Sequence, residues 1–218
     1  MTDDTPVTSA PGAADDPSTP EFWDARYGES DRLWSGEPNP QLVAEIAEVE
    51  AGTAVDIGCG EGADAIWLAR RGWRVTGADI SSVALERARA HGDQAGVEVE
   101  WVQTDLLAWQ APADGFDLVN VQFFQLAEPE RTVALRRFAA AVAPGGLLLV
   151  VAHHPVHAET GVPGPPADRL YTPEDVTALF AAPEWETVTA ETRTRTAAGH
   201  HSGTTEFTDS VVLLRRAR

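Results

Sequence analysis

The fold is decided by one stretch, Val55-Asp-Ile-Gly-Cys-Gly-Glu-Gly-Ala-Asp64, in which an apolar run gives way to glycines and then to a helical pattern. Residues 53–57 have the composition of a buried strand, and residues 63–71 carry apolar side chains at helical spacing before Gly72. Residues 73–78 predict a second strand. A strand, a crossover helix and another strand in this order form a βαβ unit with parallel strands, so the stretch predicts an α/β fold.

Downstream of this unit, helical and strand patterns continue to alternate. We expect helices over residues 82–91 and 128–142, and strands over residues 97–103, 116–121 and 147–152. This alternation predicts a doubly wound sheet with helices on both faces. Ligands of such sheets bind at the carboxyl ends of the strands, where the strand order reverses.

The C-terminal part of the chain predicts a helix followed by an antiparallel hairpin. Thr172 is a capping residue, and Pro173 and two acidic residues follow it, so a helix is expected from Pro173 to about Phe180. Residues 186–195 and 206–215 alternate Thr, Val and charged side chains around a Gly-containing turn, a pattern typical of two paired strands.

The N-terminal fifty residues divide into a tail and a cap. Residues 1–20 combine Asp, Thr, Ser, Pro, Ala and Gly, which predicts a disordered tail. Residues 21–50 contain aromatic side chains and a helical pattern over residues 41–49, so we expect an ordered cap there. With residues 51–218 as the Rossmann-like core, residues 21–218 are expected to form a single domain.

Charge and cysteine content restrict the partners and the compartment. The chain has 34 acidic residues against 16 basic ones, all of them arginine, and a net charge of -18, which disfavours nucleic acid as a partner. Cys59 is the only cysteine, so no intrachain disulfide can form. The first residues lack a secretory signal, and no run approaches the ~20 apolar residues of a membrane span. We therefore expect a cytoplasmic protein without a membrane partner.

The glycine turn matches the cofactor patterns of two classes of protein. Gly58, Gly60 and Ala63 satisfy the dinucleotide pattern G-x-G-x-x-G/A, and Asp79 follows about twenty residues later, so an NAD(P)-dependent oxidoreductase is one alternative. Asp56 argues against it, because a carboxylate ~4 Å from a pyrophosphate costs about 4 kcal/mol at an effective dielectric constant of ~20. The same carboxylate favours a cationic ligand such as S-adenosylmethionine, and Glu61 would add to that preference.

Four motifs in order resemble those of the class I S-adenosylmethionine-dependent methyltransferases. They are Val55-Asp-Ile-Gly-Cys-Gly-Glu-Gly-Ala-Asp-Ala65, Val75-Thr-Gly-Ala-Asp-Ile-Ser81, Val102-Gln-Thr-Asp-Leu106 and Phe116-Asp-Leu-Val-Asn-Val-Gln-Phe-Phe124, followed by Pro144-Gly-Gly146 before the fifth strand. The resemblance implies a mostly parallel, seven-stranded Rossmann-like sheet of order 3-2-1-4-5-7-6 that ends in an antiparallel hairpin.

The resemblance also implies which residues hold the cofactor. Gly58 and Gly60 would pass close to S-adenosylmethionine, Asp56 would serve its amino-acid end, and Asp79 would accept hydrogen bonds from both ribose hydroxyls. The further expected contacts are those of Ile80, Asp105, Leu106 and Gln122. The product would be S-adenosylhomocysteine.

The cap resembles the N-terminal segment of the thiopurine, thiol and tellurite-resistance branch of small-molecule methyltransferases. The matching segments are Phe22-Trp-Asp-Ala-Arg-Tyr27 and Trp34-Ser-Gly-Glu-Pro-Asn-Pro40. That branch implies an aromatic lid, for which Tyr27, Trp34, Phe123 and Phe124 are the candidate substrate-binding residues, with ordinary core packing as the alternative for each ring.

On the acceptor side, the sequence offers histidines but names no acceptor. Methyl transfer is an in-line displacement that mainly needs alignment and exclusion of water, so a base is needed only by an acceptor that must lose a proton. His153 and His154, at the end of the fifth strand, are the candidate catalytic bases, and a solvated rim position is the alternative. A metal site that also uses His157, His200 and His201 is an open alternative that we do not adopt.

The sequence therefore predicts an enzyme that transfers a methyl group from S-adenosylmethionine to a small-molecule acceptor, either a thiol or chalcogen or a nitrogen or oxygen nucleophile. A non-catalytic module that binds the cofactor is the other alternative, because a fold does not guarantee chemistry. The acceptor stays open, and a monomer and a homodimer are both compatible with the sequence. Cys59 lacks a local histidine partner and is expected to pack rather than react.

Overall fold

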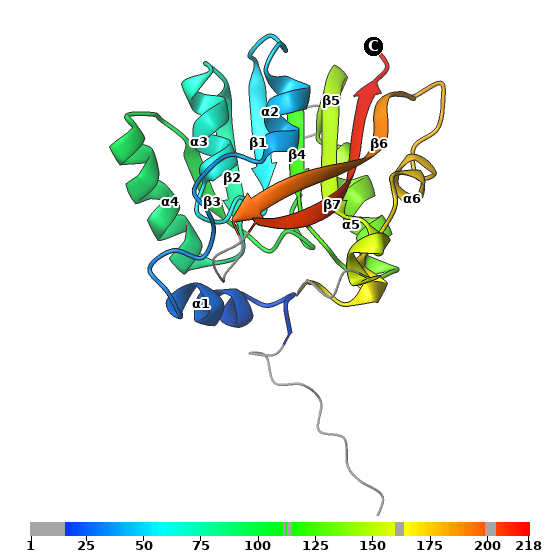
Figure 1. Cartoon of the computed structure of the whole chain (residues 1–218). Helices are drawn as coiled ribbons and strands as arrows, with labels where there is room; N and C mark the ends of the chain where they lie inside the picture. Colours follow the sequence, from blue (N-terminus) through cyan, green and yellow to red (C-terminus); the bar gives the residue numbers. More distant parts are fainter. Residues whose placement is uncertain (1–15, 111, 113–114, 160–163, 199–203) are drawn as a thin grey trace, which may run out of the picture.

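The computed structural model describes residues 16–110, 112, 115–159, 164–198 and 204–218 (Figure 1). Most of the expected tail, residues 1–15, lies outside the described residues. Residues 16–20 lead into the first helix, which begins at Pro20, and the Thr19 side chain accepts a hydrogen bond from the backbone N–H of Phe22. The cap therefore begins one residue before the expected position.

Seven strands form one sheet in the order β3-β2-β1-β4-β5-β7-β6. The strands from β1 to β5 are parallel to their neighbours, whereas β7 runs antiparallel to both β5 and β6. The predicted strand order and the C-terminal hairpin are thereby confirmed. The strands are β1 (Thr53–Ile57), β2 (Arg74–Asp79), β3 (Glu100–Gln103), β4 (Phe116–Gln122), β5 (Val142–His153), β6 (Trp185–Ala198) and β7 (Thr204–Arg216).

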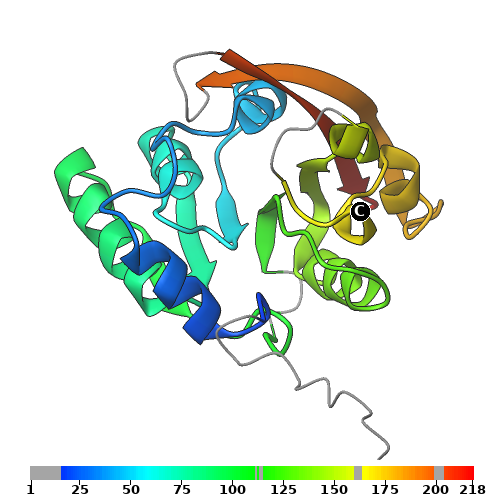
Figure 2. The ribbon, with the colours of Figure 1, turned by 60° about the horizontal axis from the view of Figure 1, so that its bottom comes forward.

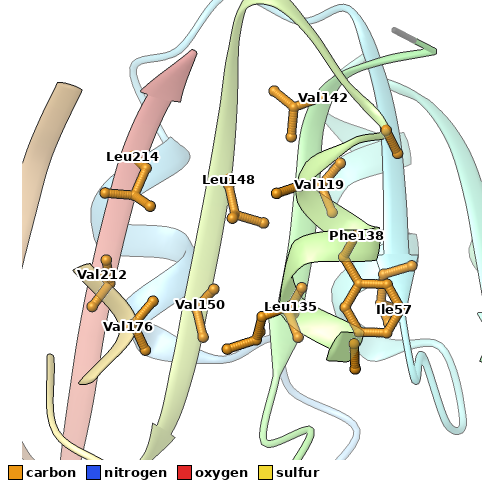
Figure 3. Close-up of a cluster of buried hydrophobic side chains, with 14 of the residues drawn as sticks. Ile57, Val119, Leu135, Phe138, Val142, Leu148, Val150, Val176, Val212 and Leu214 are labelled. Atoms are coloured by element: carbon orange, nitrogen blue, oxygen red, sulfur yellow. The ribbon is translucent and has the colours of Figure 1, made fainter. Parts of the chain in front are cut away.

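Helices cover both faces of this sheet, and the sheet separates two apolar cores. The helices are α1 (Pro20–Gly28), α2 (Pro40–Ile46), α3 (Ala63–Arg70), α4 (Ser82–Ala95), α5 (Glu130–Ala139) and α6 (Pro173–Thr177), with 3-10 turns at Pro155–Glu159 and Ala167–Arg169. On one face, α2 and α3 contribute Leu42 and Leu68 to the core. On the other, α5 and α6 pack Phe138, Leu135 and Val176 against β4, β5 and β7 (Figure 3).

The carboxyl ends of the parallel strands lie at one edge of the sheet, the lower edge in Figure 1. Helix α1 lies below this edge and packs against α4, and Figure 2 shows the same arrangement from below. The cap and the glycine turn after β1 therefore meet at the edge where ligands of doubly wound sheets bind.

Several element boundaries differ from the sequence prediction, and two of these differences have identifiable reasons. Helix α4 continues one turn past His91, because Gly92 is accommodated inside the helix beside the Trp101 ring, and the helix ends at Gly96 with φ 68°. Helix α5 ends at Ala139, three residues earlier than expected, because Val142 already pairs with Phe116 in the sheet.

No helix in the described part of the chain combines the length and the apolar character that crossing a lipid bilayer requires.

Candidate functional site

The glycine turn after β1 has a backbone that only glycine adopts without strain. Gly58, Gly60 and Gly62 have φ angles of 69°, 52° and 86°, in the left-handed region. A Cβ atom at Gly60 would lie 2.7 Å from the Tyr27 hydroxyl oxygen, and one at Gly62 would lie 2.6 Å from the Trp101 ring. The turn is therefore held against the cap on one side and against the sheet on the other.

Asp79, at the end of β2, fixes this turn through its carboxylate. Oδ2 accepts a hydrogen bond from the Gly60 N–H at 2.8 Å, and Oδ1 accepts one from the Ser81 N–H at 2.8 Å. Burial raises the pKa of Asp79, although these backbone bonds oppose the shift. A carboxylate has about four lone-pair positions, so each oxygen keeps capacity for another donor, such as a ribose hydroxyl.

Asp56, at the carboxyl end of β1, presents a buried oxygen without a partner. Its side chain is 2% exposed, and Oδ1 accepts a hydrogen bond from Asn120 Nδ2 at 2.8 Å. Oδ2 has no hydrogen-bond partner among the described residues. Burial, and next the nearby Asp64 carboxylate, raise the pKa of Asp56 well above its usual value. Hydrogen bonds from Asn120 and the Ala65 backbone oppose this shift, but Oδ2 keeps room for a donor, and the ammonium of S-adenosylmethionine fits this requirement.

A chain of side-chain amides connects Asp56 to the cap. Beyond Asn120, Gln122 Nε2 donates to Asn120 Oδ1 at 2.6 Å, and Asn39 Nδ2 donates to Gln122 Oε1 at 2.7 Å. The Asn39 backbone N–H donates to Asp64 Oδ1 at 2.6 Å. We call Asn39, Gln122, Asn120 and Asp56 the amide relay. Gln122 was expected at the cofactor, whereas Asn39 and Asn120 were missed, although a polar side chain inside the apolar strand β4 was an available signal.

Glu61 does not extend the negative charge of the site, contrary to the expectation from the sequence. Its carboxylate forms an ion pair with Arg87 at 2.9 Å and accepts hydrogen bonds from the backbone N–H groups of Leu33 and Trp34. The side chain is buried, and these partners balance its charge locally. Glu61 therefore attaches the cap to the glycine turn, and the ligand-directed charge is that of Asp56.

Two of the four predicted lid aromatics cover the turn from the cap. Trp34 Nε1 donates a hydrogen bond to the Tyr27 hydroxyl at 3.0 Å, and both side chains lie against Gly60. Tyr27 is buried, which raises the pKa of its hydroxyl, whereas Trp34 is 49% exposed. The Phe124 ring lies next to Gly58 and packs edge-on against Phe138 in the core.

Phe123, the fourth of these aromatics, turns toward the β5 to β7 side of the sheet instead. Its ring centroid lies 4.6 Å from that of His153, and Arg195 lies over the same ring at 5.1 Å. His153 Nδ1 is 3.5 Å from the buried carboxylate of Asp209. His154 Nδ1 accepts a hydrogen bond from the Val156 N–H, so this ring nitrogen serves a local turn. Arg195 and Asp209 were not singled out from the sequence.

The residues predicted for the adenine end occupy different environments. The Asp105 side chain is exposed, and its Oδ1 accepts a hydrogen bond from the Leu107 N–H at 2.9 Å. The Leu106 side chain is buried in the core cluster. Ile80 follows β2, and its carbonyl accepts a hydrogen bond from Gln103. The structure brings the backbone of residues 79–80 and 104 together through the Thr104 N–H, which donates to the Asp79 carbonyl at 2.9 Å.

Two further expectations concern reactive or metal-binding groups. Burial raises the pKa of the Cys59 thiol well above its usual value, in agreement with a packing role. Within the described ranges, no three His, Cys, Asp or Glu side chains gather as metal ligands would. His200 and His201 lie outside the described residues, as does the side chain of His157, so the metal alternative is not tested.

Comparisons with known proteins show what part of the chain is similar to. Residues 54–146 match the family described as "Methyltransferase domain". The trans-aconitate 2-methyltransferase of Azoarcus sp. (strain BH72) is 36% identical over 151 residues, which cover 65% of this chain and 56% of that protein.

Two solved structures share the fold. One, described as "Conversion of a Disulfide Bond into a Thioacetal Group during Echinomycin Biosynthesis", has a TM-score of 0.72 at 23% identity and covers 91% of both chains. The magnesium protoporphyrin IX methyltransferase of Synechocystis PCC 6803 with bound SAH has a TM-score of 0.60 at 18% identity, with 81% of this chain and 78% of that chain covered.

Residues 54–146 are therefore similar to a methyltransferase domain, as the resemblance to class I S-adenosylmethionine-dependent methyltransferases implies, and the fold of the chain is that of these two solved structures. The particular branch within this class is not distinguished by these matches. The chain spans about half the length of the curated relatives it matches, with 56%, 38% and 53% of three of them covered.

Proposed function

We propose that this chain transfers a methyl group from S-adenosylmethionine to a small-molecule acceptor at the carboxyl edge of β1, β4 and β5. The observation that carries the proposal is the buried Asp56 Oδ2, which has no partner within the described residues and lies beside the glycine turn. S-adenosylmethionine, when bound, supplies an electrophilic methyl group on a sulfonium centre. We further propose that residues 21–218 act as one domain, as a monomer or a homodimer in the cytoplasm.

Different residues of the chain bind different parts of the cofactor. Asp56 accepts a hydrogen bond from the ammonium group, and Gly58 and Gly60 allow the backbone to approach the methionine part closely. Asp79 accepts hydrogen bonds from the ribose hydroxyls with the lone pairs that the turn leaves unused. For the adenine end we propose Ile80, Asp105 and Leu106; Leu106 acts through its backbone, because its side chain is buried in the core. Gln122 acts through the amide relay.

On the acceptor side, the chain aligns the acceptor and excludes water. Tyr27 and Trp34 lie against Gly60, and Phe124 lies against Gly58. A dry, fixed geometry is what an in-line displacement requires. An acceptor that attacks as an anion, such as a thiolate, a chalcogen or a carboxylate, needs no base. For a protonated acceptor we propose His153, which lies beside Asp209, in preference to His154, whose Nδ1 is engaged by the backbone.

The acceptor class is not fixed by the relatives. The resemblance of the cap favours a thiol or chalcogen acceptor. The name of the Azoarcus relative indicates a carboxylic acid substrate for that protein. Both classes present an anionic nucleophile, which needs no general base.

Calorimetric titration of the full chain with S-adenosylmethionine and S-adenosylhomocysteine tests the cofactor assignment. We expect both to bind, and NADH to leave the protein unaffected. Absence of binding by both compounds would contradict the proposal. Incubation with methyl-labelled cofactor and a panel of thiols, phenols, amines, carboxylic acids and chalcogen oxyanions, followed by mass spectrometry, then tests transfer. Cofactor retention without labelled product on the whole panel would favour a non-catalytic binding module instead.

A further inference from the structure

Near the glycine turn, the ends of four strands bring five side chains together. Strands β6 and β7 extend beyond β5 toward the end of β4 (Figure 1), and the contact of Arg195 with Phe123 shows that they reach it. We call these five residues the arginine cluster: Phe123 after β4, His153 at the end of β5, Arg195 on β6, and Phe207 and Asp209 on β7.

Arg195 is held in this cluster from two directions. Its Nε donates to Asp209 Oδ2 at 2.6 Å, and its guanidinium carbon lies 5.1 Å from the Phe123 ring centroid and 4.6 Å from that of Phe207. Asp209 is fully buried, whereas Arg195 is 17% exposed. Its terminal nitrogens Nη1 and Nη2 donate hydrogen bonds to none of the described residues. Neither nitrogen is fully buried. Solvent, or a ligand, therefore reaches them.

Phe123 is placed in this cluster at a conformational cost. Its φ angle is 54°, and it is the non-glycine residue with positive φ in the described part of the chain. For an aromatic residue this conformation is strained, and such strain concentrates at binding and catalytic sites. Its N–H donates to the Val151 carbonyl at 2.7 Å, which holds the strained turn in place. Phe123 directly follows Gln122 of the amide relay, so the cluster adjoins the cofactor site.

We propose that the Arg195 guanidinium binds a carboxylate group of the methyl acceptor through Nη1 and Nη2. The planar fork of these two nitrogens matches the two oxygens of a carboxylate, and stacking on two rings together with the Asp209 bond orients the fork in advance. This inference rests on the proposed function, because it treats the cluster as the acceptor part of the methyl-transfer site.

A carboxylate suits this fork better than a phosphate. Asp209 already balances the charge of Arg195, so the second charge of a dianion would meet no second arginine in the cluster. The net charge of -18 and the nearby Asp56 add to the repulsion of a dianion. The Phe123 and Phe207 rings beside the fork provide apolar contact for the carbon skeleton of an organic acid.

Matched pairs of neutral and charged probes test this proposal on the full chain loaded with S-adenosylhomocysteine. The pairs are phenylacetate with phenylacetamide, and 3-phenylpropanoate with its amide, titrated by calorimetry. We expect the carboxylates to bind at least about 10-fold more tightly than the amides, as a charged hydrogen-bond pair would give. Arg195→Lys keeps the positive charge but removes the planar fork. We expect this variant to bind the carboxylates about 10- to 100-fold more weakly and the amides with unchanged affinity.

The matched control is Arg193→Lys, because Arg193 lies two residues away on β6 and pairs with Glu45 and Glu191 but contacts no ring of the cluster. It should bind carboxylates as the unmodified chain does. Equal binding of carboxylates and amides, or an Arg195→Lys chain that keeps the carboxylate preference, would overturn the proposal. Loss of carboxylate and amide binding together would indicate a structural role and would also overturn it.

Two measurements keep the outcome decisive. If Arg195→Lys fails to fold, phenylglyoxal labelling of the unmodified chain replaces it, with mass spectrometry at Arg195. Protection by phenylacetate but not by phenylacetamide supports the proposal, and equal labelling contradicts it. If S-adenosylhomocysteine does not bind, the proposed function fails, while the same probe pairs titrated into the unloaded chain still decide whether Arg195 selects a carboxylate.

Discussion

Asn120 Nδ2 donates a hydrogen bond to Asp56 Oδ1 at 2.8 Å and leaves Oδ2 of the same carboxylate buried without a partner among the described residues. This pair orders the amide relay, because an acceptor at Asp56 requires Asn120 to present its NH₂ group. The Asn120 oxygen then faces Gln122, and the Gln122 oxygen faces Asn39. One buried carboxylate thus sets the orientation of three amides, and the last of them belongs to the cap.

Asp56→Asn should change cofactor affinity and stability in opposite directions. The amide cannot offer the ammonium a charged acceptor, so we expect affinity for S-adenosylmethionine to fall about 10- to 100-fold in calorimetry. Burial raises the pKa of Asp56, so its ionised form destabilises the fold at neutral pH, and the variant should gain about 1 kcal/mol or more in urea denaturation.

The control for this pair of measurements is Asp117→Asn. The Asp117 carboxylate accepts hydrogen bonds from the Thr53 backbone and hydroxyl near the opposite edge of the sheet, and these bonds lower its pKa. This variant should lose stability and leave cofactor affinity unchanged. A loss of affinity equal to that of Asp56→Asn would show that the effect is not specific to the glycine turn.

The amide relay should couple the cap to β4 energetically. Asn39→Ala and Gln122→Ala each remove the 2.7 Å bond between them, and each leaves a partner unsatisfied. A double-mutant cycle in urea denaturation should give a coupling energy of about 1 kcal/mol, because the two residues share one bond although they are 83 positions apart. Asn39→Ala also removes the N-cap residue of helix α2. This loss occurs in both the single and the double variant, so the cycle subtracts it from the coupling energy. Strict additivity would argue against the relay.

Glu61→Gln should loosen the cap more than it weakens cofactor binding. The change breaks a buried ion pair with Arg87 and weakens the acceptor for two backbone N–H groups, which costs about 3 kcal/mol in stability. Trp34 should become more accessible to acrylamide, measured by fluorescence quenching against a background of the other tryptophans. Glu86→Gln, an exposed position on α4, should change stability by less than about 0.5 kcal/mol. A cofactor affinity that falls as far as in Asp56→Asn would show that Glu61 does add to the preference for a cationic ligand.

The sequence predicted those features that depend on local pattern. The strands β1 and β4 and the turn at Gly58 and Gly60 follow from apolar runs and glycines that are adjacent in the chain, and four ordered motifs extended this to the strand order. The boundary of α4 was misjudged, because the Trp101 ring that accommodates Gly92 comes from a later strand.

The site was predicted less completely because its pairings join distant residues. Glu61 was expected to add to the preference for a cationic ligand, yet its charge is used by Arg87 and by the cap, 26 to 28 positions away. Arg195 and Asp209 lie in a hairpin whose alternating Thr and charged residues are typical of a solvated ribbon. Only the strand register brings both onto the same side as His153, and no local pattern encodes that register.

The acidic residues around the glycine turn should give the unliganded chain an unusual pH dependence. Burial raises the pKa of Asp64 from 3.8 to about 6. A carboxyl group whose pKa is higher in the folded state stabilises the fold when protonated, so this contribution is present below about pH 4 and is lost as the pH rises to about 6, by at most about 3 kcal/mol. Asp64→Asn should flatten this part of the stability profile. Asp117→Asn should remove an opposite slope, because the lowered pKa of Asp117 stabilises the fold at higher pH.

Cofactor affinity should follow the opposite trend to stability over the same interval. The ammonium of S-adenosylmethionine keeps its charge throughout, so its binding improves as the carboxylates at the turn ionise, and the cofactor then relieves the repulsion that destabilises the unliganded chain. Urea denaturation from pH 4 to 7 with and without S-adenosylhomocysteine, which carries the same ammonium, should show a difference in unfolding free energy that increases with pH. A difference that is constant over this range would show that no carboxylate of the turn titrates against the ligand.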